Sequence, residues 1–331
     1  MSRTALVAVG GNSLIRAGEK GTIVEQVANA RRTARAMVGL IRLGYRLAIT
    51  HGNGPQVGAQ LLRSERASDV VYSQTLDVCG AASQGEIGYL LEQALRNELA
   101  EAHIEVPVVS LVTQTLVSPD DPAMRTPSKP IGPFYSRADA EERRRTLGWH
   151  IVEDAARGYR RIVPSPEPLE IVQLDIIRWL LARKVLVVST GGGGIPVVRV
   201  KGELQGVEAV IDKDRASALL ASQLGVDLFA ISTDTDYVYL NYKRPDQTPL
   251  TYVSISQLEE YLHAGHFPAG NMGPKIESVI YFLRNGGKQA VITSVELLCE
   301  AVAGHAGTRV VHDTAMGGEA VEQELEEPVF R

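Results

Sequence analysis

The chain has 331 residues, of which 44% are hydrophobic and 22% are charged, and its formal net charge is −5. The length allows one large α/β domain or two lobes that share a sheet. The acidic balance argues against binding to nucleic acid through net charge, and no segment has the roughly 18 apolar residues that a membrane span needs. The N-terminal apolar run is too short for a signal peptide, so a cytoplasmic protein is expected.

In the first third of the chain, apolar strands alternate with glycine-bearing loops and helices. The expected elements, in order, are a strand at 5–9, a helix at 24–42, a strand at 45–50, a helix from Pro55, a helix at 75–102 and a strand at 106–112. Strands that are apolar throughout are typical of a parallel sheet covered on both faces.

Residues 118–168 break this alternation. The segment holds eight prolines and the charge run "EERRR" at 141–145, which is expected to be a solvated face. A long irregular insertion of this kind predicts a protruding subdomain or lid. The predicted divisions are therefore an N-terminal lobe at 1–117, a lid at 118–168, a C-terminal lobe at 169–312 and a mobile tail at 313–331.

After the insertion the alternation resumes. The expected elements are a helix near 170–182, a strand at 185–189, a helix at 212–225, a strand at 227–233, a helix at 254–265 capped by Ser254 or Ser256, a helix at 273–287, and strands at 289–294 and 308–311. The cysteines, Cys79 and Cys299, lie far apart without metal-ligand spacing, so both are predicted to be free thiols. No metal site made of protein side chains is predicted.

Three glycine loops each follow an apolar strand: "GGNSL" at 10–14, "HGNGPQVG" at 51–58 and "GGGGIP" at 191–196. Ligands of parallel sheets bind beyond the carboxyl ends of the strands. Because glycine has no Cβ, its backbone N–H can approach an anion closely, and a following helix adds a positive end. A phosphate or polyphosphate ligand is expected, although neither a Walker A loop nor a dinucleotide fingerprint is present.

Three lysines lie at element boundaries beside residues that stiffen the backbone. Lys129 lies between prolines, Lys213 is flanked by Asp212 and Asp214, and Lys275 follows a proline at a helix start. Phosphoryl transfer depends on positioning and on neutralising charge, which lysines can do. A carboxylate beside Lys213 could orient that lysine or a metal.

Taken together, these motifs resemble the carbamate kinase branch of the amino acid kinase family. The matching stretches run in order over about 310 residues and are "GGNSL" (10–14), "THGNGPQVG" (50–58), "CGAASQGEIGY" (79–89), "PSKPIGPFY" (127–135), "GYRRIVPSPEP" (158–168), "GGGGIPV" (191–197), "EAVIDKDRASALLA" (208–221), "TDTDYVYLN" (233–241) and "GNMGPKIES" (270–278).

The resemblance implies an open αβα sandwich with a mainly parallel central sheet and a protruding lid. It implies reversible phosphoryl transfer between ATP and carbamate, giving ADP and carbamoyl phosphate, with Mg²⁺ accompanying the nucleotide. In the family this reaction often makes ATP in a fermentative pathway such as arginine deimination. A homodimer is expected, with no nucleic acid or membrane partner.

The resemblance also implies roles for individual residues. Lys129 and Lys213 would stabilise the transferring group, and Asp214 would orient Lys213. The carbamate and the transferred phosphoryl group would be held by Gly10, Gly11, Asn12, Gly52, Asn53 and Gly54. The nucleotide side would be held by Gly191, Gly192, Gly193, Asp234, Tyr237, Met272 and Lys275.

Some alternatives stay open. Ala8 stands where many acid-phosphorylating relatives have a lysine, and Ser13 stands where alanine is commoner; the first change favours the carbamate branch. Phosphorylation of acetylglutamate or another small acid, or a nucleotide sensor with reduced catalysis, would fit much of the same pattern. The absence of a dinucleotide fingerprint argues against a nicotinamide dehydrogenase. His51 could act as a base, but a hydrogen bond to its own loop is the more ordinary role.

Overall fold

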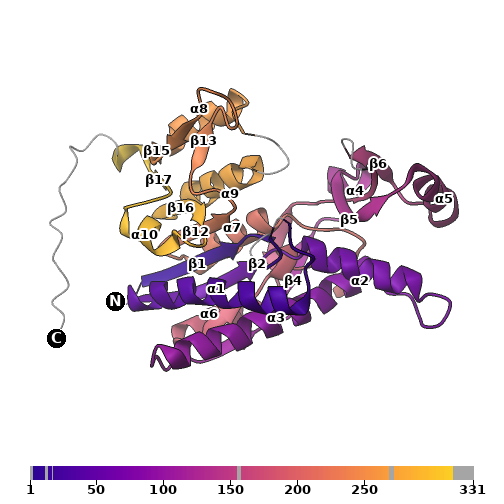
Figure 1. Cartoon of the computed structure of the whole chain (residues 1–331), viewed down its shortest axis with the longest axis horizontal. Coiled ribbons are helices and arrows are strands. Elements are labelled where there is room, and N and C mark those ends of the chain that lie inside the picture. The colour runs from indigo at the N-terminus through magenta and orange to yellow at the C-terminus, as the bar shows by residue number, and fades with distance from the viewer. Residues whose placement is uncertain (1–2, 12–13, 17, 155–157, 268–271, 316–331) are drawn as a thin grey trace.

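The computed structural model describes residues 3–11, 14–16, 18–154, 158–267 and 272–315, and its centre is an eight-stranded sheet (Figure 1). Neighbouring strands are parallel, except that β16 and β17 are antiparallel. In spatial order the strands are β15 (Tyr252–Ser254), β17 (Thr308–Val311), β16 (Gln289–Ser294), β12 (Leu228–Thr233), β1 (Arg3–Val9), β2 (Tyr45–His51), β9 (Leu186–Val188) and β3 (Val108–Ser110). The predicted α/β sandwich with a mainly parallel sheet is confirmed.

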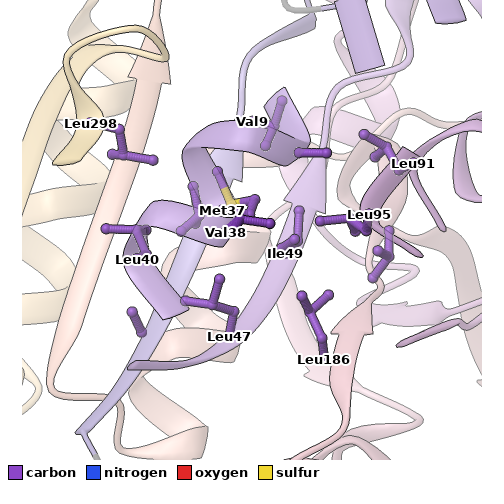
Figure 2. Packing of buried hydrophobic residues seen from close by; sticks show 14 of the residues in the cluster. Val9, Met37, Val38, Leu40, Leu47, Ile49, Leu91, Leu95, Leu186 and Leu298 are labelled. Carbon is purple, nitrogen blue, oxygen red and sulfur yellow. The ribbon is translucent and has the colours of Figure 1, made fainter. Parts of the chain in front are cut away.

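Helices cover both faces of this sheet. One face packs against α1 (Ile23–Arg42), α3 (Leu76–Glu101) and α10 (Leu298–Ala303), and the other against α6 (Leu174–Ala182), α7 (Lys213–Leu224), α8 (Ile255–His263) and α9 (Met272–Arg284). Figure 2 shows the first of these cores, in which Met37 of α1 lies over the sheet beside Ile49. Along β1 the side chains alternate: Val7 enters this core and Leu6 the opposite one, as the period of a strand requires.

Capping residues fix where several helices begin. Thr22 forms a capping box with Glu25 at the start of α1, and this signal was not used in the prediction. Ser254 caps α8 in the same way with Gln257, which decides between the two serines considered. Strand–helix alternation was therefore predictable, and the caps refine its boundaries.

Several short strands were not predicted. A second, four-stranded sheet contains β11 (Glu203–Gly206), β10 (Ile195–Val200), β4 (Gln114–Val117) and β8 (Pro168–Ile171), and a hairpin pairs β13 (Val238–Leu240) with β14 (Thr248–Leu250). These strands have three to six residues, and several contain proline, so their period-two signal is weak.

The segment predicted as a lid contains its own sheet. Its members are β5 (Lys129–Tyr135), β7 (Gly158–Val163) and β6 (Ile151–Asp154), with the helices α4 (Pro122–Arg125) and α5 (Arg137–Leu147). This unit projects from the body beside α2 (Gly54–Arg66) (Figure 1). The two approach closely, because a Cβ atom on Gly58 of α2 would lie 3.1 Å from Cα of Gly132 in β5.

The charge run at 141–145 is not simply a solvated face, and that prediction is wrong for Arg143. Its side chain is only 12% exposed, forms an ion pair with Glu65 of α2, and lies over the ring of Tyr135. Arg144 donates to the carbonyl oxygen of Ile151. The run therefore fastens α5 to the body and to its own sheet.

At the C-terminus, Asp313–Ala315 form a 3-10 turn, η3, and Asp313 accepts a hydrogen bond of 3.0 Å from the backbone N–H of Ser256. Described secondary structure thus continues past residue 312, and the rest of the predicted tail, 316–331, lies outside the described residues. Within the described part of the chain, every helix is too short or too polar to cross a membrane.

Candidate active site

The three glycine loops meet at one edge of the central sheet, where β1, β2 and β9 end. A Cβ atom on Gly52 would lie 2.7 Å from Cα of Gly11, so the first two loops are in contact. A Cβ atom on Gly192 would overlap the side chain of Asn53, so the third loop lies against the second. Asn12 and Ser13 of the first loop lie outside the described residues.

The run of four glycines has a steric explanation. Gly191–Gly193 form a 3-10 turn, η2, and Gly192, Gly193 and Gly194 have positive φ angles of 64°, 91° and 88°. A Cβ atom on Gly191 would overlap the ring of His51, and one on Gly193 would lie 2.8 Å from the carbonyl oxygen of Ile211. Side chains are therefore excluded by the backbone conformation and by close neighbours.

A cavity of about 160 Å³, which we call the acceptor cavity, opens where these loops meet the lid. Its walls combine the second and third glycine loops with the first strand of the lid and the start of α7. The lining residues are Gly52, Asn53, Gly54, Val57, Lys129, Pro130, Ile131, Arg160, Gly192, Val210, Ile211 and Lys213. Six predicted site residues thus share one cavity, and Arg160 joins them without having been predicted.

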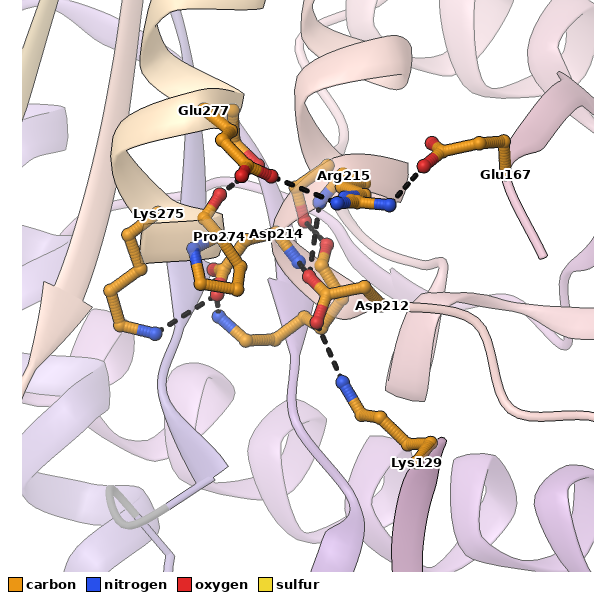
Figure 3. A network of polar contacts seen from close by, with 11 residues as sticks. Lys129, Glu167, Asp212, Asp214, Arg215, Pro274, Lys275 and Glu277 are labelled. Atoms are coloured by element: carbon orange, nitrogen blue, oxygen red, sulfur yellow. Dashed lines mark hydrogen bonds and ion pairs between the residues drawn. The ribbon is translucent and has the colours of Figure 1, made fainter. Parts of the chain in front are cut away.

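A compact charge network surrounds the first turn of α7 (Figure 3). Asp214 accepts from Nζ of Lys213 at 2.6 Å and from Nζ of Lys275 at 2.9 Å, and all three side chains are 12% exposed or less. Burial raises the pKa of Asp214, but the two ammonium groups outweigh burial and hold that pKa below its ordinary value. Burial lowers the pKa of Lys213, and Asp214 opposes that shift.

The predicted arrangement of these groups needs one change. Asp214 pairs with Lys275 as well as with Lys213, so the lysine assigned to the nucleotide and the lysine assigned to transfer share one carboxylate. The other flanking carboxylate, Asp212, accepts from Nζ of Lys129 in the lid at 2.6 Å. Charges from the lid, α7 and α9 therefore meet in one network.

Arg215 extends this network on the outer side of α7. Its guanidinium forms ion pairs with Glu167, just before β8, and with Glu277 of α9, whose Oε2 lies 2.8 Å away (Figure 3). Glu277 lies two residues after Lys275 on the same helix. Two adjacent residues of α7 thus bind two residues of α9 that are two positions apart.

His51 is buried at the end of β2. Its Nδ1 lies 3.1 Å from the carbonyl oxygen of Gly52, so the ring forms the hydrogen bond to its own loop that was expected as its more ordinary role. Burial is the main cause that lowers the pKa of His51 to about 4, and the charge of Lys213 lowers it further while the Gly52 carbonyl opposes both. The imidazole is neutral at neutral pH and is a weak base.

A second cavity, of about 290 Å³, lies beyond β12 and beside α9. Aromatic side chains dominate its walls, and two predicted residues line it. The lining residues are Asp234, Thr235, Tyr239, Tyr242, Lys243, His266, Phe267 and Met272. Tyr237 is not one of them; its ring packs edge-on against that of Tyr239 with centroids 6.2 Å apart.

The two cavities are linked by α9. Lys275 follows Met272 by about one helical turn, roughly 5 Å along the axis, and binds Asp214 beside Lys213 of the acceptor cavity. A long ligand could therefore place a flat ring in the aromatic cavity and an anionic end at the lysines. Tyr239 was missed because its motif, "TDTDYVYLN", also offers Tyr237, and Tyr242 lies one residue beyond that motif.

The described residues contain no group of three carboxylate, imidazole or thiol side chains that could hold a metal ion. The two carboxylates that flank Lys213, those of Asp212 and Asp214, already accept hydrogen bonds from lysines. Both cysteines are free, as predicted.

Comparisons with known proteins agree with this geometry. The model of the amino acid kinase family matches residues 3–294. Carbamate kinase of Thermococcus kodakarensis is 46% identical over 314 residues, which are 94% of this chain and 100% of that protein. Carbamate kinase of Trichomonas vaginalis is 42% identical over 309 residues, 92% of this chain and 98% of that protein. The structure of carbamate kinase from Giardia lamblia bound to AMP-PNP matches with a TM-score of 0.89 and 42% identity, covering 95% of this chain and 100% of that one.

Proposed function

This chain belongs to the amino acid kinase family, and from that premise we propose that it transfers a phosphoryl group reversibly between ATP and carbamate. The products are ADP and carbamoyl phosphate. The observation that carries the proposal is the acceptor cavity, in which Lys129 of the lid and Lys213 of α7 face the glycines of the second and third loops. Relatives that cover nearly the whole chain and are called carbamate kinases support the choice of acid.

The mechanism we infer is electrostatic. Carbamate is already an anion, so the main obstacle is repulsion between it and the γ-phosphate, and removing a proton would contribute little. The ammonium groups of Lys129 and Lys213 would neutralise the oxygens of the transferring group. The backbone N–H group of Gly54 would help to hold the acid beside Gly52, whose own N–H donates to the carbonyl oxygen of Val9. Asp214 would hold Lys213 and Lys275 in place, since it binds both.

The nucleotide would lie along α9. We propose that its base occupies the aromatic cavity beside Met272 and Tyr239, and that its phosphates reach Lys275 and then Lys213. The AMP-PNP bound to the relative from Giardia lamblia supports an ATP-like ligand. Mg²⁺ would enter with the nucleotide as part of the substrate, because it is commonly bound through phosphate oxygens and water. The lysine-bound carboxylates of this site are consistent with that arrangement.

The lid would exclude water from the cavity. Carbamate and carbamoyl phosphate are labile, so a covered site protects them during transfer. We propose 118–168 as this lid, 1–117 as the acceptor lobe and 169–312 as the nucleotide lobe. The close contact of Gly58 with Gly132 gives the lid a defined seat on α2.

The experiment that tests the reaction is ATP formation from ADP, Mg²⁺ and carbamoyl phosphate, followed through hexokinase. The parent should turn over, and Lys129→Ala and Lys213→Ala should lose most of that rate while remaining folded. A folded parent that binds nucleotide without turnover would overturn the proposal. A panel of small acids, acetylglutamate included, would then separate another acid kinase from a nucleotide sensor.

Two wider aspects belong to the same proposal. We propose a homodimer, supported by Tyr89 and Val112, which lie near the edge strand β3 and are 62% and 56% exposed. Sedimentation of the parent and of Val112→Asp tests it; a monomeric parent would refute it.

We also propose that the cell uses the reaction to make ATP in an arginine-deiminase type of pathway. Deleting the gene should then lower the ATP that cells form from arginine.

A further inference from the structure

Asp212 joins two parts of the site that come from distant segments. Its Oδ2 lies 2.6 Å from Nζ of Lys129, which is 83 positions away and belongs to the lid. Its Oδ1 accepts from the backbone N–H of Asp214 at 2.9 Å and of Arg215 at 3.3 Å, and so caps α7. One carboxylate therefore fixes the start of α7 and the lid lysine together (Figure 3).

We propose that Asp212 is a positioning residue, whose carboxylate holds the ammonium of Lys129 over the acceptor cavity. The proposal rests on the proposed function. An ammonium group has three N–H donors, and one of them goes to Asp212. The other two remain for the oxygens of the transferring group, so Lys129 can keep its partner while it binds substrate.

Without this carboxylate, the surroundings would repel Lys129. The first turn of α7 carries partial positive charge on its N–H groups, and Lys213 lines the same cavity. The lid lysine is also the more exposed partner, since its side chain is 36% exposed and that of Asp212 is 16% exposed. Asp212 thus supplies the negative charge that lets two lysines face one small cavity.

Helix capping alone does not account for an aspartate at this position. In this chain α1, α5 and α8 are capped by the hydroxyl groups of Thr22, Ser136 and Ser254. A hydroxyl or an amide would cap α7 comparably. Only a carboxylate offers a second, charged oxygen for the lysine.

The ionisation of Asp212 agrees with this role. Burial raises the pKa of Asp212, but Lys129 and then Lys213 lower it, and the pKa lies below its ordinary value although Asp214 opposes them. The carboxylate is therefore charged at neutral pH.

The test is Asp212→Asn, which keeps a good capping residue and removes the charge. Asp227→Asn is the matched control, because Asp227 also binds a lysine, Lys288, and a backbone N–H, that of Thr4, outside the acceptor cavity. For Asp212→Asn we expect kcat/KM for carbamoyl phosphate to fall about 10-fold to 100-fold, as loss of a charge-assisted hydrogen bond would cause. The KM for ADP should match that of the parent, the unfolding midpoint should fall modestly because a stabilising charge is lost, and Asp227→Asn should leave the kinetics unchanged.

A second arm shows whether Asp212 acts through Lys129. Under single-turnover conditions, adding Asp212→Asn to Lys129→Met should change the rate by less than about twofold, because the partner is already gone. Unchanged kinetics in Asp212→Asn, an equal rise in the KM for ADP, or full additivity with Lys129→Met would each overturn the inference. These outcomes require a parent that turns over carbamoyl phosphate; an inactive parent would instead refute the proposed function, and with it this role.

Discussion

Lys275 lies 61 positions after Asp214 in the sequence, yet its Nζ is 2.9 Å from Oδ2 of that aspartate, and both side chains are buried. The other oxygen of Asp214 binds Lys213. Two lysines that would contact different phosphate groups are therefore held at a fixed spacing by one carboxylate. Fixed cations need no rearrangement as charge develops in the transition state.

Asp214→Asn should destabilise the protein and abolish turnover. The change leaves Lys213 and Lys275 buried without their counter-charge, and breaking a buried ion pair costs about 3–5 kcal/mol. Urea denaturation at neutral pH measures this loss. A further Lys275→Met should recover part of the stability and none of the activity. Unaltered stability of Asp214→Asn would show that the carboxylate is not needed to keep these lysines buried.

His51 should make the protein less stable in mild acid. Its pKa is about 4 in the folded state against 6.5 ordinarily, so only the unfolded chain takes up the proton between these values. Folding stability should therefore fall as pH decreases from 6.5 to about 4, by about 3 kcal/mol in total. The contribution of Asp214 is lost only at lower pH, because its depressed pKa lies below the ordinary range of a carboxyl group.

Denaturation at several pH values checks this, with His51→Gln expected to flatten the slope above pH 4. His305→Gln, at an exposed position, is the control and should keep the slope of the parent. An identical slope in His51→Gln would assign the acid sensitivity to other groups.

Gly192→Ala should impair activity more than its strain alone explains. Its φ of +64° costs an alanine about 1 kcal/mol, and the new Cβ would overlap the side chain of Asn53 in the acceptor cavity. Gly225→Ala is the matched control, because Gly225 has the same φ of +64° with open space around it. Gly192→Ala should lose more stability than Gly225→Ala, because the buried Asn53 must shift to admit the new Cβ atom. Only Gly192→Ala should raise the KM for carbamoyl phosphate. Equal kinetics in the two variants would leave the third loop without a role in the cavity.

Gly58→Val should lift the lid from α2. The Cβ atom of any new side chain would lie 3.1 Å from Cα of Gly132, and the two methyl groups of valine would press further on β5, which carries Lys129. We expect a higher KM for carbamoyl phosphate and unchanged affinity for nucleotide, measured by kinetics and titration. Gly80→Val, at an open position within α3, should change neither. Normal kinetics in Gly58→Val would show that the lid reaches its working position without this seat.

Much of this site was predictable because its parts are local. A strand followed by glycines can be read from consecutive residues, and parallel strands bring such loops to one edge without further information. Lysines at element boundaries were recognisable for the same reason. The pairing of Asp212 with Lys129 was not, since it depends on where the lid folds back onto α7.

Arg160 and Arg161 show the limit more sharply. Neighbouring side chains of a strand lie on opposite faces, so only one of these two arginines can be directed to the acceptor cavity. The structure turns Arg160 to the acceptor cavity and pairs Arg161 with Glu208. That choice depends on the register of β7 against β5, where Arg161 lies opposite Ile131. Nothing in the local pattern of "GYRRIV" fixes that register.

The segment Asp212–Arg215 has a consequence for how this protein can change. Its four successive side chains each bind a different partner, in a different direction around one helical turn. In order, the partners are Lys129, Asp214, Lys275, and the pair Glu167 and Glu277. Inserting or deleting one residue would rotate everything beyond it by about 100° and would misdirect all of these bonds together. A substitution here disturbs the bonds of one residue, whereas a change of length disturbs those of every residue beyond it, so altered spacing should damage the site more widely than altered chemistry.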